Sequence, residues 1–255
     1  MKEFNELIDV IETLRHPEKG CPWDLKQTAK TLIPGMIEEV YEVAEAVENG
    51  DVKGLKEELG DCLLHILLQS KIAKDEDKFT IEDVINGIKD KLIRRHPHIF
   101  GDDKLSDPVE VKKRWEQLKM AEKGERQSVL EGVPTAMPGL LQGQRLQEKA
   151  ASVGFDWDSI EPVFGKIQEE IVEVKEEIES GDREKLEMEI GDLLFSVVNL
   201  SRKLDIHSET ALKRANKKFS DRFKKVEQRF KEKGINIYEA SLEDMDKVWE
   251  SIKRG

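Results

Sequence analysis

Apolar residues recur at intervals of three or four along almost the whole chain, and strand-like alternation is nearly absent. This periodicity predicts helices over residues 4–14, 27–49, 52–74, 81–95 and 109–123, and again over 140–152, 161–180, 182–204, 208–233 and 241–253. Amphipathic helices joined by short loops are typical of helical bundles. We therefore expect an all-α fold.

The helical pattern stops in the middle of the chain. Residues 124–139 contain three glycines and two prolines and show no sustained period. The second half then repeats the order of helices in the first. We predict two tandem, repeated helical-bundle domains, residues 1–123 and 140–255, joined by a linker at 124–139.

The repeat is visible residue by residue in its acidic segment. When Glu38–Leu64 is aligned with Glu169–Phe195 without a gap, 13 of the 27 positions are identical. Both copies read Glu-Glu-x-x-Glu, then Gly-Asp, then Glu-x-Gly-Asp. A glycine just past a helix end favours termination there, so each copy should form two antiparallel helices joined by the Gly-Asp turn.

Residues three or four apart are neighbours on a helix surface, so carboxylates from both helices of each copy should converge. The candidate metal ligands are Glu39, Glu42, Glu58 and Asp61 in the first copy, and Glu170, Glu173, Glu189 and Asp192 in the second. Hard oxygen ligands without His or Cys favour Mg²⁺, with Mn²⁺ as an alternative, over Zn²⁺. The competing interpretation is an acidic, merely solvated helix surface.

Composition narrows the class of protein. The net charge of −12 over 255 residues disfavours a broad surface for duplex nucleic acid. Two cysteines in dissimilar contexts do not make a disulfide framework, and the five histidines do not recur between the halves, so we interpret them as structural or incidental. The polar N-terminus and the lack of a long apolar run predict no membrane segment and a cytoplasmic location.

Basic and aromatic residues follow the acidic helices in each half. An anionic substrate would need such cationic contacts, although the same charges could simply keep a helix soluble. A Trp-Glu-x-x-Lys sequence also appears twice, at Trp115 and at Trp249. Its recurrence at the same stage of both halves makes base stacking a possible role.

Several segments together resemble the MazG nucleoside triphosphate pyrophosphohydrolases. They are the two acidic motifs, Arg94–Gly101, Ser128–Pro134, Leu146–Ala151 and Val153–Trp157. The resemblance covers essentially the whole chain, including its tandem arrangement. It implies an all-α pyrophosphatase fold, a homodimer, and Mg²⁺-dependent hydrolysis of nucleoside triphosphates to monophosphate and pyrophosphate.

The resemblance and the residue pattern together nominate roles for individual residues. The eight carboxylates named above would hold the metal, and Glu38 and Glu169 are candidates for the general base. The candidate substrate-binding residues are Lys91, Arg94, Arg95, Trp115, Lys119, Lys166, Asn216, Lys217, Lys218, Arg222, Trp249 and Lys253. The basic segments differ between the halves, so the two sites need not have equal activity. The resemblance favours the second site as the principal catalyst. A non-catalytic nucleotide-binding regulator, a helical interaction scaffold, and a pyrophosphohydrolase of narrower specificity stay open as alternatives.

Overall fold

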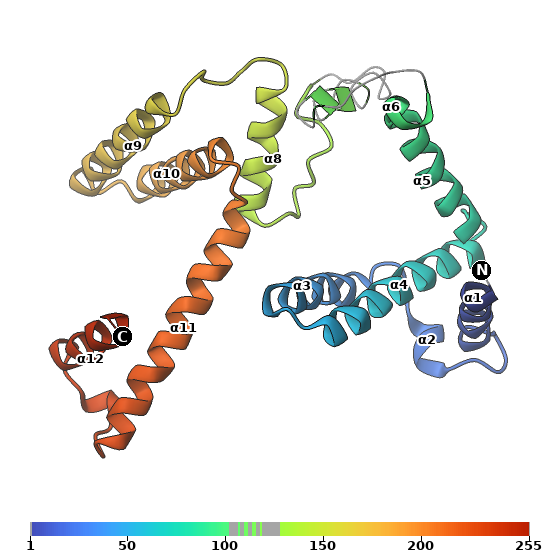
Figure 1. Cartoon of the computed structure of the whole chain (residues 1–255), viewed down its shortest axis with the longest axis horizontal. Helices are drawn as coiled ribbons and strands as arrows, with labels where there is room; N and C mark the ends of the chain where they lie inside the picture. Colours follow the sequence, from blue (N-terminus) through green and yellow to red (C-terminus); the bar gives the residue numbers. More distant parts are fainter. Residues whose placement is uncertain are drawn as a thin grey trace. The chain divides into compact units, whose positions relative to one another are not determined.

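The computed structural model describes residues 2–101 and 128–254, together with 107, 110, 111, 114, 115 and 118. The chain divides into two compact units, Met1–Leu118 and Lys119–Gly255. Every regular element in the described residues is a helix, which confirms the predicted all-α class (Figure 1). Most of the helix predicted at 109–123, and the first part of the predicted linker, lie outside the described residues.

Both units are built from helices in close succession. The first unit contains α1 (Lys2–Leu14), α2 (Pro22–Lys26), α3 (Ile33–Asn49), α4 (Val52–Asp75), α5 (Ile81–Arg95) and α6 (Pro97–Phe100). The second contains α8 (Gly139–Ala151), α9 (Glu161–Ser180), α10 (Arg183–Lys203), α11 (Ser208–Glu232), the 3₁₀ turn η1 (Ile237–Glu239) and α12 (Leu242–Arg254).

The start of α3 differs from the prediction, because the helix begins at Ile33 and not near residue 27. Pro34 occupies the first turn, where its missing N–H costs nothing. Ahead of it, Thr28 and Thr31 form a turn in which each hydroxyl accepts from the other's backbone N–H, at 2.9 and 3.2 Å. These side-chain bonds compete with a helical backbone. The predicted loop before this turn instead holds the short helix α2.

The Gly-Asp pair of each repeat turns the chain between two antiparallel helices. Gly50 and Gly181 end α3 and α9 in the left-handed conformation, with φ of 66° and 73°. Asp51 then caps α4 by accepting two backbone N–H bonds at 3.1 and 2.9 Å. Asp182 caps α10 in the same way, at 3.1 and 3.2 Å. As a result α3 packs along α4, and α9 packs along α10.

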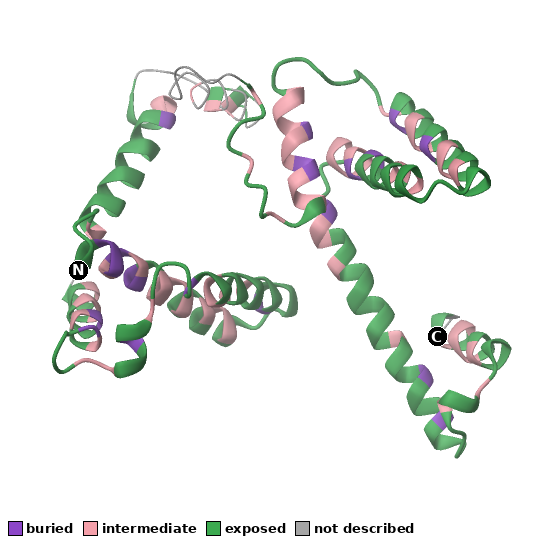
Figure 2. Cartoon of the chain, turned by 180° about the vertical axis from the view of Figure 1, so that it is seen from behind, coloured by how far each residue is buried: buried purple, intermediate pink, exposed green. Residues whose placement is uncertain are grey.

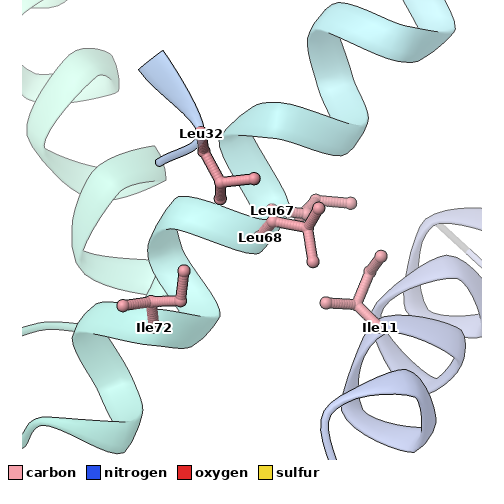
Figure 3. Close-up of a cluster of buried hydrophobic side chains, with 5 residues drawn as sticks. All are labelled: Ile11, Leu32, Leu67, Leu68 and Ile72. Atoms are coloured by element: carbon pink, nitrogen blue, oxygen red, sulfur yellow. The ribbon is translucent and has the colours of Figure 1, made fainter. Parts of the chain in front are cut away.

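The core of the first unit lies between α1, α4 and the turn before α3. Its buried members are Ile11, Leu32, Leu67, Leu68 and Ile72, which converge in Figure 3. The apolar periodicity of α1 and α4 predicts most of this contact, because residues at helical spacing share one face. The core therefore anchors the half of α4 that follows the acidic motif.

The second unit is held together by smaller apolar contacts and by buried amides. Val163, Val198 and Val226 are almost fully buried. The side-chain oxygen of Gln144 accepts from the N–H and the hydroxyl of Ser208, both at 3.0 Å. Gln147 donates to the carbonyl of Phe195 at 2.8 Å. These bonds join α8 to α10 and to the start of α11.

Large apolar residues remain exposed on both helix hairpins, whose ribbons are largely coloured as exposed in Figure 2. On α3 they recur every seven residues, and the equivalent positions of α9 repeat them. The exposed fractions are 46% for Ile33, 54% for Val40 and 58% for Val47, and 49% for Phe164, 39% for Ile171 and 61% for Ile178. None of the helices in the described ranges combines the length and apolar character needed to cross a bilayer.

Candidate metal centres

The first hairpin brings three of its four predicted ligands together. Carboxylate oxygens of Glu39 on α3, and of Glu58 and Asp61 on α4, all lie within 4.8 Å of one another. Glu42 stands beside this group, close enough for its charge to act on both Glu39 and Glu58. This is the convergence that the antiparallel hairpin predicts.

Like charges at this range repel one another in the absence of a cation. Burial, and then the charges of Glu42 and Asp61, raise the pKa of Glu39. Desolvation, and then the charges of Glu42 and Glu39, raise the pKa of Glu58. Both carboxyls therefore hold a proton more readily than an isolated glutamate does, and a divalent cation would relieve the same repulsion.

The second hairpin gathers a related but different set. Oxygens of Glu170 and Glu173 on α9, and of Glu189 on α10, lie within 4.8 Å of one another. Desolvation and then the charge of Glu170 raise the pKa of Glu173. Asp192 is exposed and lies outside this three-residue group, so its role as a ligand stays a prediction.

Lys166 supplies a positive charge inside the second cluster. Its Nζ lies 2.7 Å from one oxygen of Glu170 and 2.7 Å from one oxygen of Glu169. These hydrogen bonds, with Glu169 first, raise the pKa of Lys166 well above its usual value. The ammonium group is thus held as a cation next to the predicted metal ligands.

Glu170 is the group in this cluster that most clearly fits a cation. Its side chain is only 3% exposed, and its Oε2 is buried without a hydrogen-bond partner. A buried carboxylate oxygen of this kind costs free energy unless it is paired. The donor set of clustered carboxylates is the one that Mg²⁺ prefers, so the residues fit the predicted metal.

The predicted general bases are on the outer side of each cluster. Glu38 and Glu169 are both exposed, and Glu169 is engaged by Lys166. Each lies one residue before a clustered glutamate. Successive side chains on an α-helix point about 100° apart, so Glu38 and Glu169 point in a different direction from the clustered glutamates. Their catalytic role stays a prediction.

His65 and Cys62, neither of which the sequence nominates for the site, lie on α4 near the first cluster. The Nε2 of His65 is 3.9 Å from Oε1 of Glu39. Cys62 is half-buried, and after burial the charges of Glu39, Asp61 and Glu58 raise its pKa. The sequence interpretation of His65 was structural or incidental, and the structure places its ring beside Glu39. Its spacing from Glu58 and Asp61, seven and four residues along one helix, could have indicated its position.

The predicted substrate residues of the second unit lie on α11 and α12. Asn216, Lys217 and Lys218 are exposed on α11. The ring of Trp249 on α12 lies tilted by 46° against that of Phe219, with 5.3 Å between the ring centroids, and α12 packs on α11. Lys253 lies on the same short helix and pairs with Glu250 at 3.3 Å. These residues form a basic and aromatic group on a different helix pair from the acidic cluster.

The corresponding residues of the first unit lie at the end of α5. Lys91 and Arg94 are exposed, whereas Arg95 is buried. The guanidinium of Arg95 lies over the ring of Trp115 at 5.5 Å, a cation–π contact. Lys119 lies outside the described residues. Arg222 of the second unit lies on α11 and is half-buried.

Comparison with known proteins relates both hairpins to one family. The MazG nucleotide pyrophosphohydrolase domain matches residues 27–100 and again residues 159–227. Each match contains one complete acidic cluster and its Gly-Asp turn. The duplication seen in the sequence is thus a duplication of this domain.

Two curated relatives match this chain over nearly the whole length of both proteins. The nucleoside triphosphate pyrophosphohydrolase/pyrophosphatase MazG of Thermotoga maritima is 46% identical over 99% of this chain and 96% of its own length. The nucleoside triphosphate pyrophosphohydrolase of Escherichia coli K12 is 42% identical over 100% of this chain and 98% of its own length. A crystal structure of a MazG-related protein from Thermotoga maritima matches 47% of this chain and 99% of that protein, at 32% identity and a TM-score of 0.39. The chain belongs to the MazG nucleotide pyrophosphohydrolase family.

Proposed function

We propose that this protein hydrolyses nucleoside triphosphates to nucleoside monophosphate and pyrophosphate in a reaction that depends on Mg²⁺, with Mn²⁺ as a substitute. The observation that supports this most strongly is the buried, unpartnered oxygen of Glu170 within a cluster of three carboxylates. The printed names of the full-length relatives support the same reaction.

The proposed metal ligands are the eight carboxylates of the two hairpins. In the second unit, Glu170, Glu173 and Glu189 already lie close together, and Asp192 would join them from one turn along α10. When bound, the metal would supply Lewis-acid chemistry at the phosphates and lower the pKa of a bound water. Glu169 or Glu38 would accept a proton from that water.

The remaining roles belong to the basic and aromatic residues. Lys217, Lys218 and Arg222 would neutralise the charge that develops on the departing pyrophosphate. Trp249 presents an aromatic face suited to a base, and Lys253 lies one turn further along the same helix. Lys166, which pairs with Glu170, would hold that ligand in place and contact phosphate.

We also propose that the protein is a homodimer, with the exposed apolar stripes of α3 and α9 in the interface. Apolar side chains that recur at helical spacing along one face of a helix are typical of helix-to-helix contacts. Large apolar patches left exposed on one chain indicate an interaction surface. The stripe occurs at equivalent positions in both repeats, and a second copy of the same chain offers a matching stripe to each.

Pyrophosphate release by point variants tests the activity. In a background in which Glu58→Gln disables the first cluster, Glu173→Gln should lower turnover by at least about tenfold, since perturbing metal ligation commonly costs ~10–100-fold. The matched control is Glu179→Gln, an exposed glutamate on the same helix outside the cluster. Equal turnover in the two variants, with unchanged circular dichroism, would contradict the assignment.

A further inference from the structure

The two acidic clusters differ in the charge that stands beside them, although their carboxylates are repeats of each other. When the gap-free alignment of the two hairpins is extended by a few residues, Lys166 of the second aligns with Gly35 of the first. Ser196 likewise aligns with His65. The second hairpin therefore carries a positive side chain at a position where the first has no side chain.

The ammonium group of Lys166 is shared between a buried and an exposed carboxylate. Its Nζ lies 2.7 Å from an oxygen of Glu170, whose side chain is 3% exposed, and 2.7 Å from an oxygen of Glu169, whose side chain is 57% exposed. An ion pair with a solvent-exposed partner contributes little to stability. Glu169 is therefore the partner that an incoming anion can replace, while Glu170 keeps its contact.

The charge of Lys166 also acts on a second ligand of the cluster. Burial and then the charge of Glu170 raise the pKa of Glu173, and the charge of Lys166 opposes them. A positive charge at this range lowers the affinity of the carboxylates for a further cation, because like charges repel. The Oε2 of Glu170 is nevertheless buried without a hydrogen-bond partner in the described residues. The second cluster is thus only partly neutralised and retains an oxygen that can ligate a metal.

The first cluster has an imidazole where a lysine at residue 35 would reach. A Cβ added at Gly35 would lie 2.9 Å from Cε1 and 3.1 Å from Nε2 of the His65 ring, so a lysine there requires the ring to move. The Nε2 lies 3.9 Å from Glu39, beyond hydrogen-bonding distance. After burial, the charges that raise the pKa of Glu39 and Glu58 are those of neighbouring carboxylates. The first cluster therefore lacks the lysine that partly neutralises the second.

We propose that Lys166 couples metal binding to nucleotide binding in the second hairpin. Its charge lowers the affinity of the cluster for a free divalent cation. A phosphate of the triphosphate then replaces Glu169 as a partner of Nζ and offsets that charge, so cation and nucleotide favour each other's binding. The first hairpin, with Gly35 at this position, binds the free cation without such coupling. The inference rests on the proposed function and adds a linkage between its two ligands.

Mn²⁺ alone is the first probe, with the free ion measured by electron paramagnetic resonance at about pH 8, where an imidazole is ordinarily neutral. The full chain carries Glu58→Gln, which weakens the first cluster. In this background Lys166→Met should tighten Mn²⁺ binding by about threefold or more, because a positive charge beside the carboxylates is removed. Lys175→Met, at an exposed lysine of the same helix, is the control and should leave the affinity unchanged.

The Mn²⁺ complex of α,β-methylene-ATP is the second probe, added to the same variants in a calorimeter. Lys166→Met should weaken its binding by ~10-fold, the loss expected when a hydrogen bond between charged groups is removed. The opposite signs for the two probes identify the coupling, since a distorted cluster would bind both more weakly. Lys166→Gln, which keeps a polar side chain, should behave in the same way. Free Mn²⁺ binding that is unchanged or weaker in both variants would overturn the proposal.

The reciprocal exchange tests the first hairpin. In a Glu173→Gln background, Gly35→Lys combined with His65→Ser introduces the residues of the second repeat. This double change should weaken Mn²⁺ binding by about threefold or more relative to His65→Ser alone, and equal affinity would overturn the proposed contrast. If the unsubstituted chain binds Mn²⁺ and releases pyrophosphate while Lys166→Met shifts neither probe, only the coupling fails. An unsubstituted chain that binds no Mn²⁺ contradicts the proposed function as well.

Discussion

The environment of Glu170 gives the strongest support for a bound cation. This residue is almost fully buried, one oxygen is paired with Lys166, and the other has no partner in the described residues. Glu173 and Glu189 add two further carboxylates within 4.8 Å. A buried charge is retained when something compensates it. Here Lys166 compensates part of it, and the proposed cation would compensate the remainder.

Removing the Lys166 side chain should therefore lower the stability of the second unit most when metal is absent. We expect Lys166→Met to lower the free energy of unfolding of the second unit by about 1–3 kcal/mol in EDTA, the cost of leaving a buried polar group unpaired. The partly exposed ammonium places the effect toward the lower end of that range. Saturating Mg²⁺ should shrink the loss, because a bound cation neutralises the same carboxylates.

Hydrogen exchange of the α9 amides in urea measures this effect. Lys175→Met is the matched control, because Lys175 is exposed on the same helix. A loss of equal size in both variants, or one that Mg²⁺ leaves unchanged, would show that Lys166 does not balance the charge of Glu170.

At the scale of the elements, a network of ion pairs joins α1 to α4. Lys71 Nζ lies 2.7 Å from Glu12 and 2.6 Å from Asp75, and Lys74 Nζ lies 2.7 Å from Glu12. Burial alone would raise the pKa of Glu12, but the hydrogen bonds from Lys71 and Lys74 outweigh it and hold the pKa below its usual value. The network stabilises the contact that also buries Ile11 against Leu67 and Leu68.

This shift predicts a loss of local stability in acid. A carboxyl whose pKa is lower in the folded state contributes stability above its unfolded pKa, 4.5 for Glu12, and loses it as the pH falls through the folded value. We expect Glu12→Gln to reduce the protection of α1 amides at pH 7 by about 1 kcal/mol or less, as for a partly exposed ion pair. The difference from the unsubstituted chain should fade below pH 4.5.

Hydrogen exchange of α1 at neutral and acid pH checks the expectation. Glu57→Gln, an exposed glutamate on α4, is the control and should change neither value. A Glu12→Gln difference that persists undiminished in acid would contradict the proposed role of the charge network.

Some helices of this protein can be predicted from its sequence, whereas contacts between helices cannot. The spans of α4, α5, α9 and α10 follow from apolar periodicity and the Gly-Asp turns, because those signals are local. The late start of α3 depends on mutual Thr28 and Thr31 bonds, which compete with the helix only once that turn has formed. The position of His65 depends on contact with Gly35 across the hairpin, a relation between helices that the sequence order does not show.

At the scale of the whole molecule, the described residues include few large buried side chains and two exposed apolar stripes, on α3 and α9. We expect the protein to have twice the 29.3 kDa mass of one chain in solution. Val47→Lys combined with Ile178→Lys places a charge in each stripe and should shift the protein to monomer, because burying an unpaired charge in an interface is costly.

Light scattering after size-exclusion chromatography measures this change. The control is Val52→Lys, at an apolar residue that is 79% exposed but lies outside the stripe, and it should stay dimeric. A monomeric unsubstituted chain, or a double variant that remains a dimer, would contradict the proposed interface.

The central claim is that each hairpin gathers its carboxylates around a shared divalent ion. Anomalous diffraction from crystals of the full chain grown with Mn²⁺ and a non-hydrolysable nucleoside triphosphate tests it most directly. The account predicts a Mn²⁺ peak coordinated by Glu170, Glu173 and Glu189, and a metal peak in the first hairpin beside Glu39, Glu58 and Asp61. Nucleotide bound in the crystal with no metal peak at either carboxylate group would contradict it.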